Sequence, residues 1–170
     1  AAMALHTLAK GLYEQGSYAS AVERYREAAK LYAESEEEYE AIRIRINVGA
    51  CYVCMGKVRE GIRLLRNSLS EARAGNHRRL ESFAWKSLGE AYYHRKALQR
   101  ARNCFRESDA LAIYNDEKQT DILFSNASYE WIMARDEQNP TREKIAFGRL
   151  KALRSSLERR LPEVEAFDEF

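Results

Sequence analysis

Glycine and proline are scarce in this 170-residue chain, which contains 8 Gly and 2 Pro. Together they make up about 6% of the residues, against roughly 12% in average proteins. β-Sandwiches, barrels and doubly wound α/β folds place both residues in their many turns, so this scarcity disfavours all three classes. It indicates turns that are few or very short, and therefore a helical protein.

Other absences narrow the setting in which the protein works. The 3 Cys have no disulfide-framework spacing, which favours a reducing compartment and predicts a cytoplasmic location. No apolar run approaches the ~20 residues of a membrane span, and the N-terminal residues do not resemble a signal peptide. The net charge is only +2, so neither a membrane nor nucleic acid is indicated as an obligatory partner.

Sequence motifs for catalysis and metal binding are also missing. There is no glycine-rich phosphate loop, no G-x-S-x-G and no H-E-x-x-H. Cys51-x-x-Cys54 lacks the second pair of ligands that a zinc site needs, and the position of Cys51 predicts a small core residue. A metal site shared by Cys54 and His94 is the open alternative. We expect a non-enzymatic protein with no catalytic residue, cofactor or metal.

The most informative feature that is present is an internal repeat. The chain matches itself with a period of about 40 residues, which brings small residues onto small residues and large apolar residues onto large apolar ones. The matching positions are Ala21, Gly61 and Ala101, and Tyr25, Leu65 and Phe105. Each copy contains two amphipathic stretches separated by a short turn, which predicts a pair of helices.

The glycines fall at two kinds of position within these copies. Gly16 and Gly56 stand where one helix ends and the chain reverses. Gly49, Gly61 and Gly89 stand inside helices, where Gly costs about 1 kcal/mol relative to Ala. Such positions are explained if a neighbouring helix approaches closely there.

The third copy carries a recognisable signature. Trp85-x-x-Leu88-Gly89-x-x-Tyr92, followed by Ala101-x-x-x-Phe105, resembles the tetratricopeptide repeat (TPR) family. The likeness runs from about residue 3 to residue 161 and weakens in the fourth copy. It implies an all-α, TPR-like solenoid of about four repeats, wound as a right-handed superhelix. We expect one domain over 1–170, with repeats at about 3–35, 36–75, 76–115 and 116–161 and a C-terminal cap at 162–170.

This reading predicts eight helices. The segment Asn139-Pro140-Thr141 starts the last one, since Pro suits the beginning of a helix, and Pro162 ends the repeat array. The expected ranges are 3–15, 17–33, 36–55, 57–74, 77–95, 97–114, 117–135 and 141–160.

In TPR proteins the first helix of each repeat lines a concave groove that binds peptides, and this resemblance supplies the candidate site. Asn side chains there can bond a peptide backbone through both donor and acceptor, and cations can hold a carboxylate. Family members that clamp a C-terminal carboxylate have Asn and Lys at positions like Asn47 and Lys86, although Ala50 departs from that clamp. The predicted groove residues are Lys10, Tyr13, Arg43, Asn47, Lys86, Glu90, Tyr93, Asn126 and Glu130, with His6 and Cys54 at neighbouring groove positions.

A second resemblance concerns the end of the chain. The basic segment 147–154 and the ending 161–168 are similar to the C-terminal parts of bacterial regulators that join a helix-turn-helix DNA-binding domain to a TPR domain. In the quorum-sensing members the groove binds a short signalling peptide. The resemblance implies the sensing domain of a bacterial transcriptional regulator with a protein or peptide ligand, in which nucleic acid is bound only by a separate domain outside these 170 residues.

Two alternatives stay open at this point. One is a constitutive scaffold or adaptor that forms a homo-oligomer through its apolar end helices. The other is nucleic-acid binding through the basic second helices, where Arg59, Arg63, Arg66 and Arg73 share one helical face. Aromatic residues interleaved with these cations, and a known nucleic-acid-reading motif, are missing.

Overall fold

The computed structural model describes residues 1–113 and 120–158, and every regular element in these ranges is an α-helix. The all-α prediction is confirmed, and the helix ends lie within three residues of those expected from the sequence wherever they are described. The cap predicted at 162–170 lies outside the described residues. The helices are α1 (Ala2–Glu14), α2 (Tyr18–Glu34), α3 (Glu38–Cys54), α4 (Val58–Ala74), α5 (Arg78–His94), α6 (Leu98–Ile113), α7 (Thr120–Asp136) and α8 (Pro140–Glu158).

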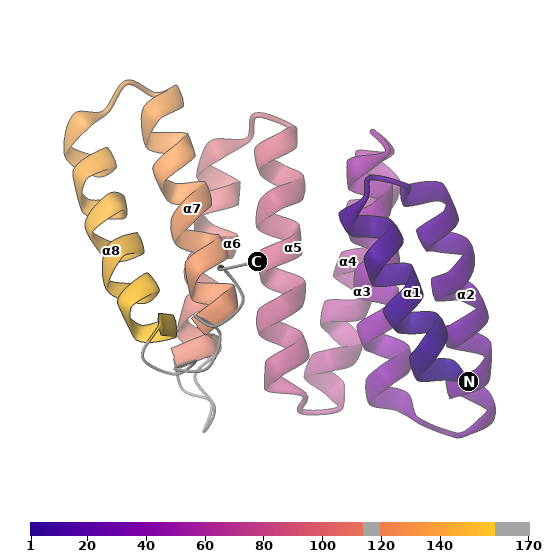
Figure 1. Cartoon of the computed structure of the whole chain (residues 1–170). Coiled ribbons are helices and arrows are strands. Elements are labelled where there is room, and N and C mark those ends of the chain that lie inside the picture. Colours follow the sequence, from indigo (N-terminus) through magenta and orange to yellow (C-terminus); the bar gives the residue numbers. More distant parts are fainter. Residues whose placement is uncertain (114–119, 159–170) are drawn as a thin grey trace, which may run out of the picture. The chain divides into compact units, whose positions relative to one another are not determined.

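The chain divides into two compact units, Ala1–Leu111 and Ala112–Phe170, which we call the N-terminal and C-terminal units. In the N-terminal unit, α1 pairs with α2 and α3 with α4, while α2 packs on α3 and α4 on α5 (Figure 1). The first helices α3 and α5 also pack on each other. In the C-terminal unit α7 packs on α8. The single domain with its four repeat boundaries stays a prediction.

One turn motif recurs at the ends of the helices. After α1, the Ser17 N–H donates to the Leu12 carbonyl at 2.9 Å and the Gly16 N–H to the Tyr13 carbonyl at 3.0 Å, which is a Schellman arrangement. The helices from α2 to α6 begin at evenly spaced positions, so that each helix pair fills one period of the repeat. The turn residue with positive φ is Gly16, Glu36, Gly56, Asn76, Lys96 or Gln138. The two predicted reversals at glycine are therefore confirmed, and other residues adopt the same backbone.

At these turns, replacing Gly by another residue should lower the free energy of unfolding, and replacing another residue by Gly should raise it. A Cβ on Gly56 would touch nothing within 4 Å, so Gly56→Ala should lose only the backbone term, about 1 kcal/mol of the free energy of unfolding. Glu36→Gly should gain about 0.5 kcal/mol, because Glu36 holds φ +56° with a side chain. Urea denaturation of both variants checks this, and a loss of stability in Glu36→Gly would contradict it.

Glycines inside helices mark the close contacts of the N-terminal unit. A Cβ added to Gly61 would lie 2.8 Å from the Gly49 carbonyl oxygen, and one added to Gly89 would lie 2.5 Å from Cε1 of Phe105. A Cβ on Gly49 would lie 2.8 Å from Cγ of Leu65. The predicted role of these three glycines in helix packing is confirmed.

A row of small buried residues follows the second helices. Ala28, Ser68 and Ser108 occupy the same position in successive repeats, and all three are fully buried. Ser108 Oγ donates to the Ser82 carbonyl and Ser82 Oγ to the Ser108 carbonyl, each at 2.9 Å, which ties α6 to α5. Ser68 Oγ has no such bond to any described residue. The position thus holds a methyl group in the first repeat and a hydroxyl without a hydrogen-bond partner among the described residues in the second. In the third repeat it holds a hydroxyl that is hydrogen-bonded.

Candidate functional site

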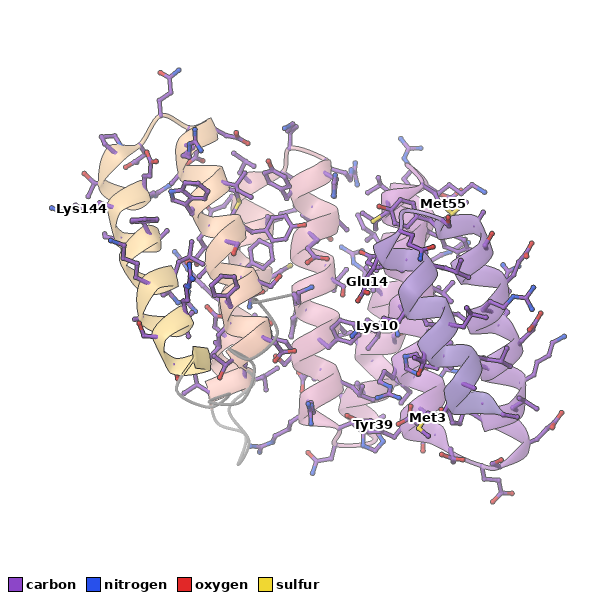
Figure 2. The ribbon with its side chains drawn as sticks, viewed as in Figure 1. Met3, Lys10, Glu14, Tyr39, Met55 and Lys144 are labelled. Atoms are coloured by element: carbon purple, nitrogen blue, oxygen red, sulfur yellow. The ribbon has the colours of Figure 1, made fainter. Side chains whose placement is uncertain are left out.

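Most of the predicted groove residues gather on one side of the N-terminal unit, which we call the first-helix face because α1, α3 and α5 form it. Figure 2 shows Lys10 and Glu14 extending from the side of α1 that faces α5. Side chains of α1 and α3 meet there, and α5 packs beside α3. The face carries Lys10, Tyr13, Arg43, Asn47, Lys86, Glu90 and Tyr93.

His6 of α1 joins the two polar residues that α3 presents. The Arg43 Nη2 lies 3.1 Å from His6 Nδ1, and the Asn47 side-chain amide lies 3.3 Å from His6 Nε2. A neutral imidazole has one acceptor nitrogen, and a guanidinium can only donate, so Nδ1 accepts and Nε2 carries the proton. The atom that faces Nε2 is the Asn47 Nδ2, also a donor; since amide nitrogen and oxygen exchange by a flip, turning the amide lets its oxygen accept from Nε2–H. The Asn47 NH₂ group is then left as a donor for a ligand.

Burial lowers the pKa of His6 below 6.5, and the positive charges of Arg43 and Lys10 lower it further. The unfolded chain therefore binds a proton more readily than the folded one, and stability should fall as the pH drops below about 6.5. His6→Gln should remove this part of the pH dependence. The check is urea denaturation at about pH 5 and about pH 8, with His94→Gln at an exposed position as control; equal slopes in wild type and His6→Gln would refute it.

A second side-chain contact joins α1 to α3 at their C-terminal ends. The Tyr13 hydroxyl lies 3.5 Å from Cys54 Sγ, linking α1 to α3. Burial raises the pKa of Tyr13 well above 10, the contact with Cys54 adds to this, and the Glu90 carboxylate of α5 raises it further. Tyr13 is therefore a neutral phenol that can exchange hydrogen bonds with a ligand.

The predicted cations of this face already have carboxylate partners. Lys86 pairs with Glu90 at 2.7 Å, and both side chains are largely buried. Lys10 pairs loosely with Glu14 at 3.8 Å in solvent, and Arg43 pairs with Glu40. Charge at the site is therefore largely balanced, which favours polar recognition over capture of a lone carboxylate. The prediction omitted Glu40, although its spacing of three residues before Arg43 on one helix was a usable signal.

Tyr93 lies at the end of α5, next to the turn. Its ring is half-buried and packs edge-on against His94, with Lys96 Nζ 5.3 Å from the ring centroid. This cation–π contact holds the ring in place without closing it to solvent. Tyr93 can extend the first-helix face as an aromatic contact surface.

The two groove residues predicted in the C-terminal unit do not present their side chains in the same way. Asn126 is fully buried, so in this structure it is a core amide that cannot touch a ligand. Glu130 is half-buried and is paired with Arg149 of α8 at 2.9 Å. The turn residue Gln138 follows the turn residue Lys96 by two residues more than the repeat length of about 40. The regular repeat offset therefore misassigned Asn126, which takes the place of buried Ala84 rather than of Lys86.

The cysteines of the C-x-x-C pair have different surroundings. Cys51 is fully buried, as predicted for a small core residue, and burial raises the pKa of its thiol to about 12. Cys54 is half-buried beside Tyr13. Among residues 1–113 and 120–158, no three His, Cys, Asp or Glu side chains are grouped as metal ligands would be. No helix in these ranges is long and apolar enough to cross a membrane.

Solved structures with similar folds share the helical-repeat architecture. The Rap conjugation gene regulator of the plasmid pLS20, in complex with the Phr* peptide, superposes with a TM-score of 0.77 at 19% identity over 95% of this chain. The apo form of RapI gives 0.66 at 15% identity over 89% of this chain. TPR-like repeats of a kinesin light chain from Podosopora anserina give 0.59 at 14% identity over 93% of this chain.

These likenesses identify the chain as a TPR-like helical-repeat protein in fold. It spans 43% of the pLS20 regulator and 42% of RapI, but 95% of the kinesin light chain repeats. No family model and no curated protein sequence matches it.

Proposed function

We propose that the chain is a non-enzymatic binding module that holds a peptide, or an extended segment of a protein, on its first-helix face. The observation that carries the proposal is the convergence of hydrogen-bonding side chains from α1 and α3 on this face, with α5 packed beside α3. Asn47 is oriented by His6, Tyr13 is held by Cys54, and Glu90 lies close enough to Tyr13 to raise its pKa. Because these groups are fixed before a ligand arrives, little side-chain entropy is lost on binding.

The chemistry of the face suits a peptide backbone. The free NH₂ of Asn47 can donate to a backbone carbonyl, and the Tyr13 hydroxyl can donate or accept. Arg43 is anchored by Glu40 and His6. The similar fold of the pLS20 Rap regulator, whose structure is a complex with the Phr* peptide, supports a ligand of this class.

We further assign the module, within this proposal, to the sensing part of a bacterial transcriptional regulator that acts in the cytoplasm. The support is the sequence resemblance to helix-turn-helix/TPR regulators together with the fold shared with the pLS20 conjugation gene regulator. DNA binding would then belong to a separate domain.

Selection of peptides on the purified chain tests the binding function directly. Peptides enriched from a displayed random library should bind Asn47→Ala about tenfold more weakly, since one hydrogen bond to a buried group is worth about 1.4 kcal/mol. Asn103→Ala is the matched control, because Asn103 is an exposed amide on the second helix α6. The proposal fails if no peptide is enriched, or if the two variants weaken binding equally.

A further inference from the structure

A hollow of about 470 Å³ opens beside α3, between α2 and α4. Ile44 and Val48 of α3 form its floor, and Ala29 and Leu64 form apolar walls. On a helix with 3.6 residues per turn, Ile44 and Val48 lie about 100° around α3 from Arg43 and Asn47. Neither Arg43 nor Asn47 lines the hollow. This α2–α4 hollow is therefore separate from the first-helix face, and the whole of it lies within the N-terminal unit.

Positive charge surrounds this apolar floor. Four cationic side chains line the hollow, against the single carboxylate of Glu60; they are Arg26, Arg45, Lys57 and Arg63. Arg26 donates to the Tyr52 hydroxyl at 2.7 Å, which leaves its charge without a counterion there. Neither Lys57 nor Arg63 forms an ion pair with a carboxylate among the described residues, so both remain available to an anion.

Two further donors lie at the same place. Arg45 pairs with Glu71 through Nη2, yet its Nε is buried without a hydrogen-bond partner in the described part of the chain. Lys57 is also the N-cap residue of α4, and its side chain makes no capping bond. The first N–H groups of α4 therefore add their partial positive charge to that of the side chains.

The next repeat shows that folding does not need these cations. The bond from Arg26 to Tyr52 is repeated by Arg66, which donates to the Tyr92 hydroxyl at 2.6 Å, so the interface itself is conserved along the chain. One repeat later, however, uncharged residues stand at the positions equivalent to Arg45, Lys57 and Arg63. The position equivalent to Glu60 holds an arginine. The residues at these four positions are Trp85, Ala97, Asn103 and Arg100. Of these two equivalent positions, only the α2–α4 hollow carries Arg45, Lys57 and Arg63.

We propose that the α2–α4 hollow binds a short segment of a protein partner in which acidic and apolar residues alternate. The carboxylates would pair with Lys57 and Arg63, and the apolar side chains would cover Ile44, Val48 and Leu64. The volume lies within the roughly 300–1,000 Å³ of ordinary binding pockets. Cations distributed over three helices match several carboxylates along one peptide better than a single anionic group. This site is independent of the first-helix face.

The test is calorimetric titration with a capped hexapeptide of alternating Glu and Leu. The double variant Lys57→Ala, Arg63→Asn introduces the residues that the next repeat carries, so it should fold and should bind about tenfold more weakly. The control Lys30→Ala, Arg59→Asn removes the same charge from exposed positions on α2 and α4 outside the hollow and should bind like wild type. Asn47→Ala should also leave this binding unchanged.

Several results would overturn the proposal. They are an absence of binding, equal weakening in the control, and equal binding of the peptide with Gln in place of Glu. Sedimentation of the free chain adds one more: a dimer that dissociates in the Lys57→Ala, Arg63→Asn variant would show that a second copy occupies the hollow instead. Loss of peptide binding in Asn47→Ala would place the peptide on the first-helix face.

Discussion

Replacing Gly89 with Leu is expected to unfold the N-terminal unit or to lower its free energy of unfolding by more than about 3 kcal/mol. Even a Cβ at this position would lie 2.5 Å from Cε1 and 2.7 Å from Cδ1 of Phe105. Phe105 is fully buried and belongs to the core of the unit, so its ring has no open space into which to move. The side chain of Leu would force α5 and α6 apart.

The measurement is thermal and urea denaturation followed by circular dichroism. Gly11→Ala is the matched control, since Gly11 also lies inside a helix and a Cβ there meets nothing within 4 Å. It should raise the free energy of unfolding by roughly 0.5–1 kcal/mol through helix propensity. A Gly89→Leu variant that melts with the wild type would show that α5 and α6 are not packed as described.

The same exchange at two equivalent buried positions should change the free energy of unfolding differently. Ser108→Ala removes a hydroxyl that donates to the Ser82 carbonyl, and should cost about 1–3 kcal/mol of the free energy of unfolding. Ser68→Ala removes a buried hydroxyl that has no partner in the described residues, and should be neutral or stabilising by up to about 1 kcal/mol. Ala28, one repeat earlier, shows that a methyl group fits this position.

Denaturation of the two single variants and the double variant measures the difference. Because the two serines lie in different helix pairs and share no partner, their effects should add in the double variant. A loss in Ser68→Ala as large as that in Ser108→Ala would mean that Ser68 is hydrogen-bonded in solution.

The fold could be predicted because equivalent positions in successive repeats meet the same packing and backbone requirements. Gly89 must be small where Phe105 crosses, and Gly16 and Gly56 suit the left-handed turn. What the composition did not reveal is that Glu36 and Lys96 adopt the same backbone as those glycines. Short turns with a shared hydrogen-bond pattern explain why so little glycine is needed.

The candidate site was less predictable, because partners across helices are not encoded by spacing along one helix. His6 reaches Arg43 and Asn47 across 37 and 41 residues, and only the packing of α1 on α3 shows that it orients both. Asn126 was misplaced because the chain adds two residues before α7, which shifts every later position on the helix. Site residues can be assigned from one repeat to the next by a fixed offset only where the repeat length stays constant.

The α2–α4 hollow was missed for a different reason. Sequence patterning assigned Arg63 and Arg66 to one basic helical face, but the structure gives them different surroundings. Arg66 donates to Tyr92, whereas Arg63 lines an apolar hollow with Arg45 of the preceding helix. The surroundings of a charged side chain depend on the helix packed beside it, which spacing along one helix does not show.

The bonds that tie neighbouring helices in the N-terminal unit also bear on how it folds. Arg26 to Tyr52, Arg45 to Glu71, Arg66 to Tyr92 and Ser82 to Ser108 each join residues 26 positions apart. Since every such contact closes a loop of the same modest length, none requires distant parts of the chain to find each other first. A topology of this kind has low contact order and favours rapid folding that can start at any helix pair and spread to its neighbours.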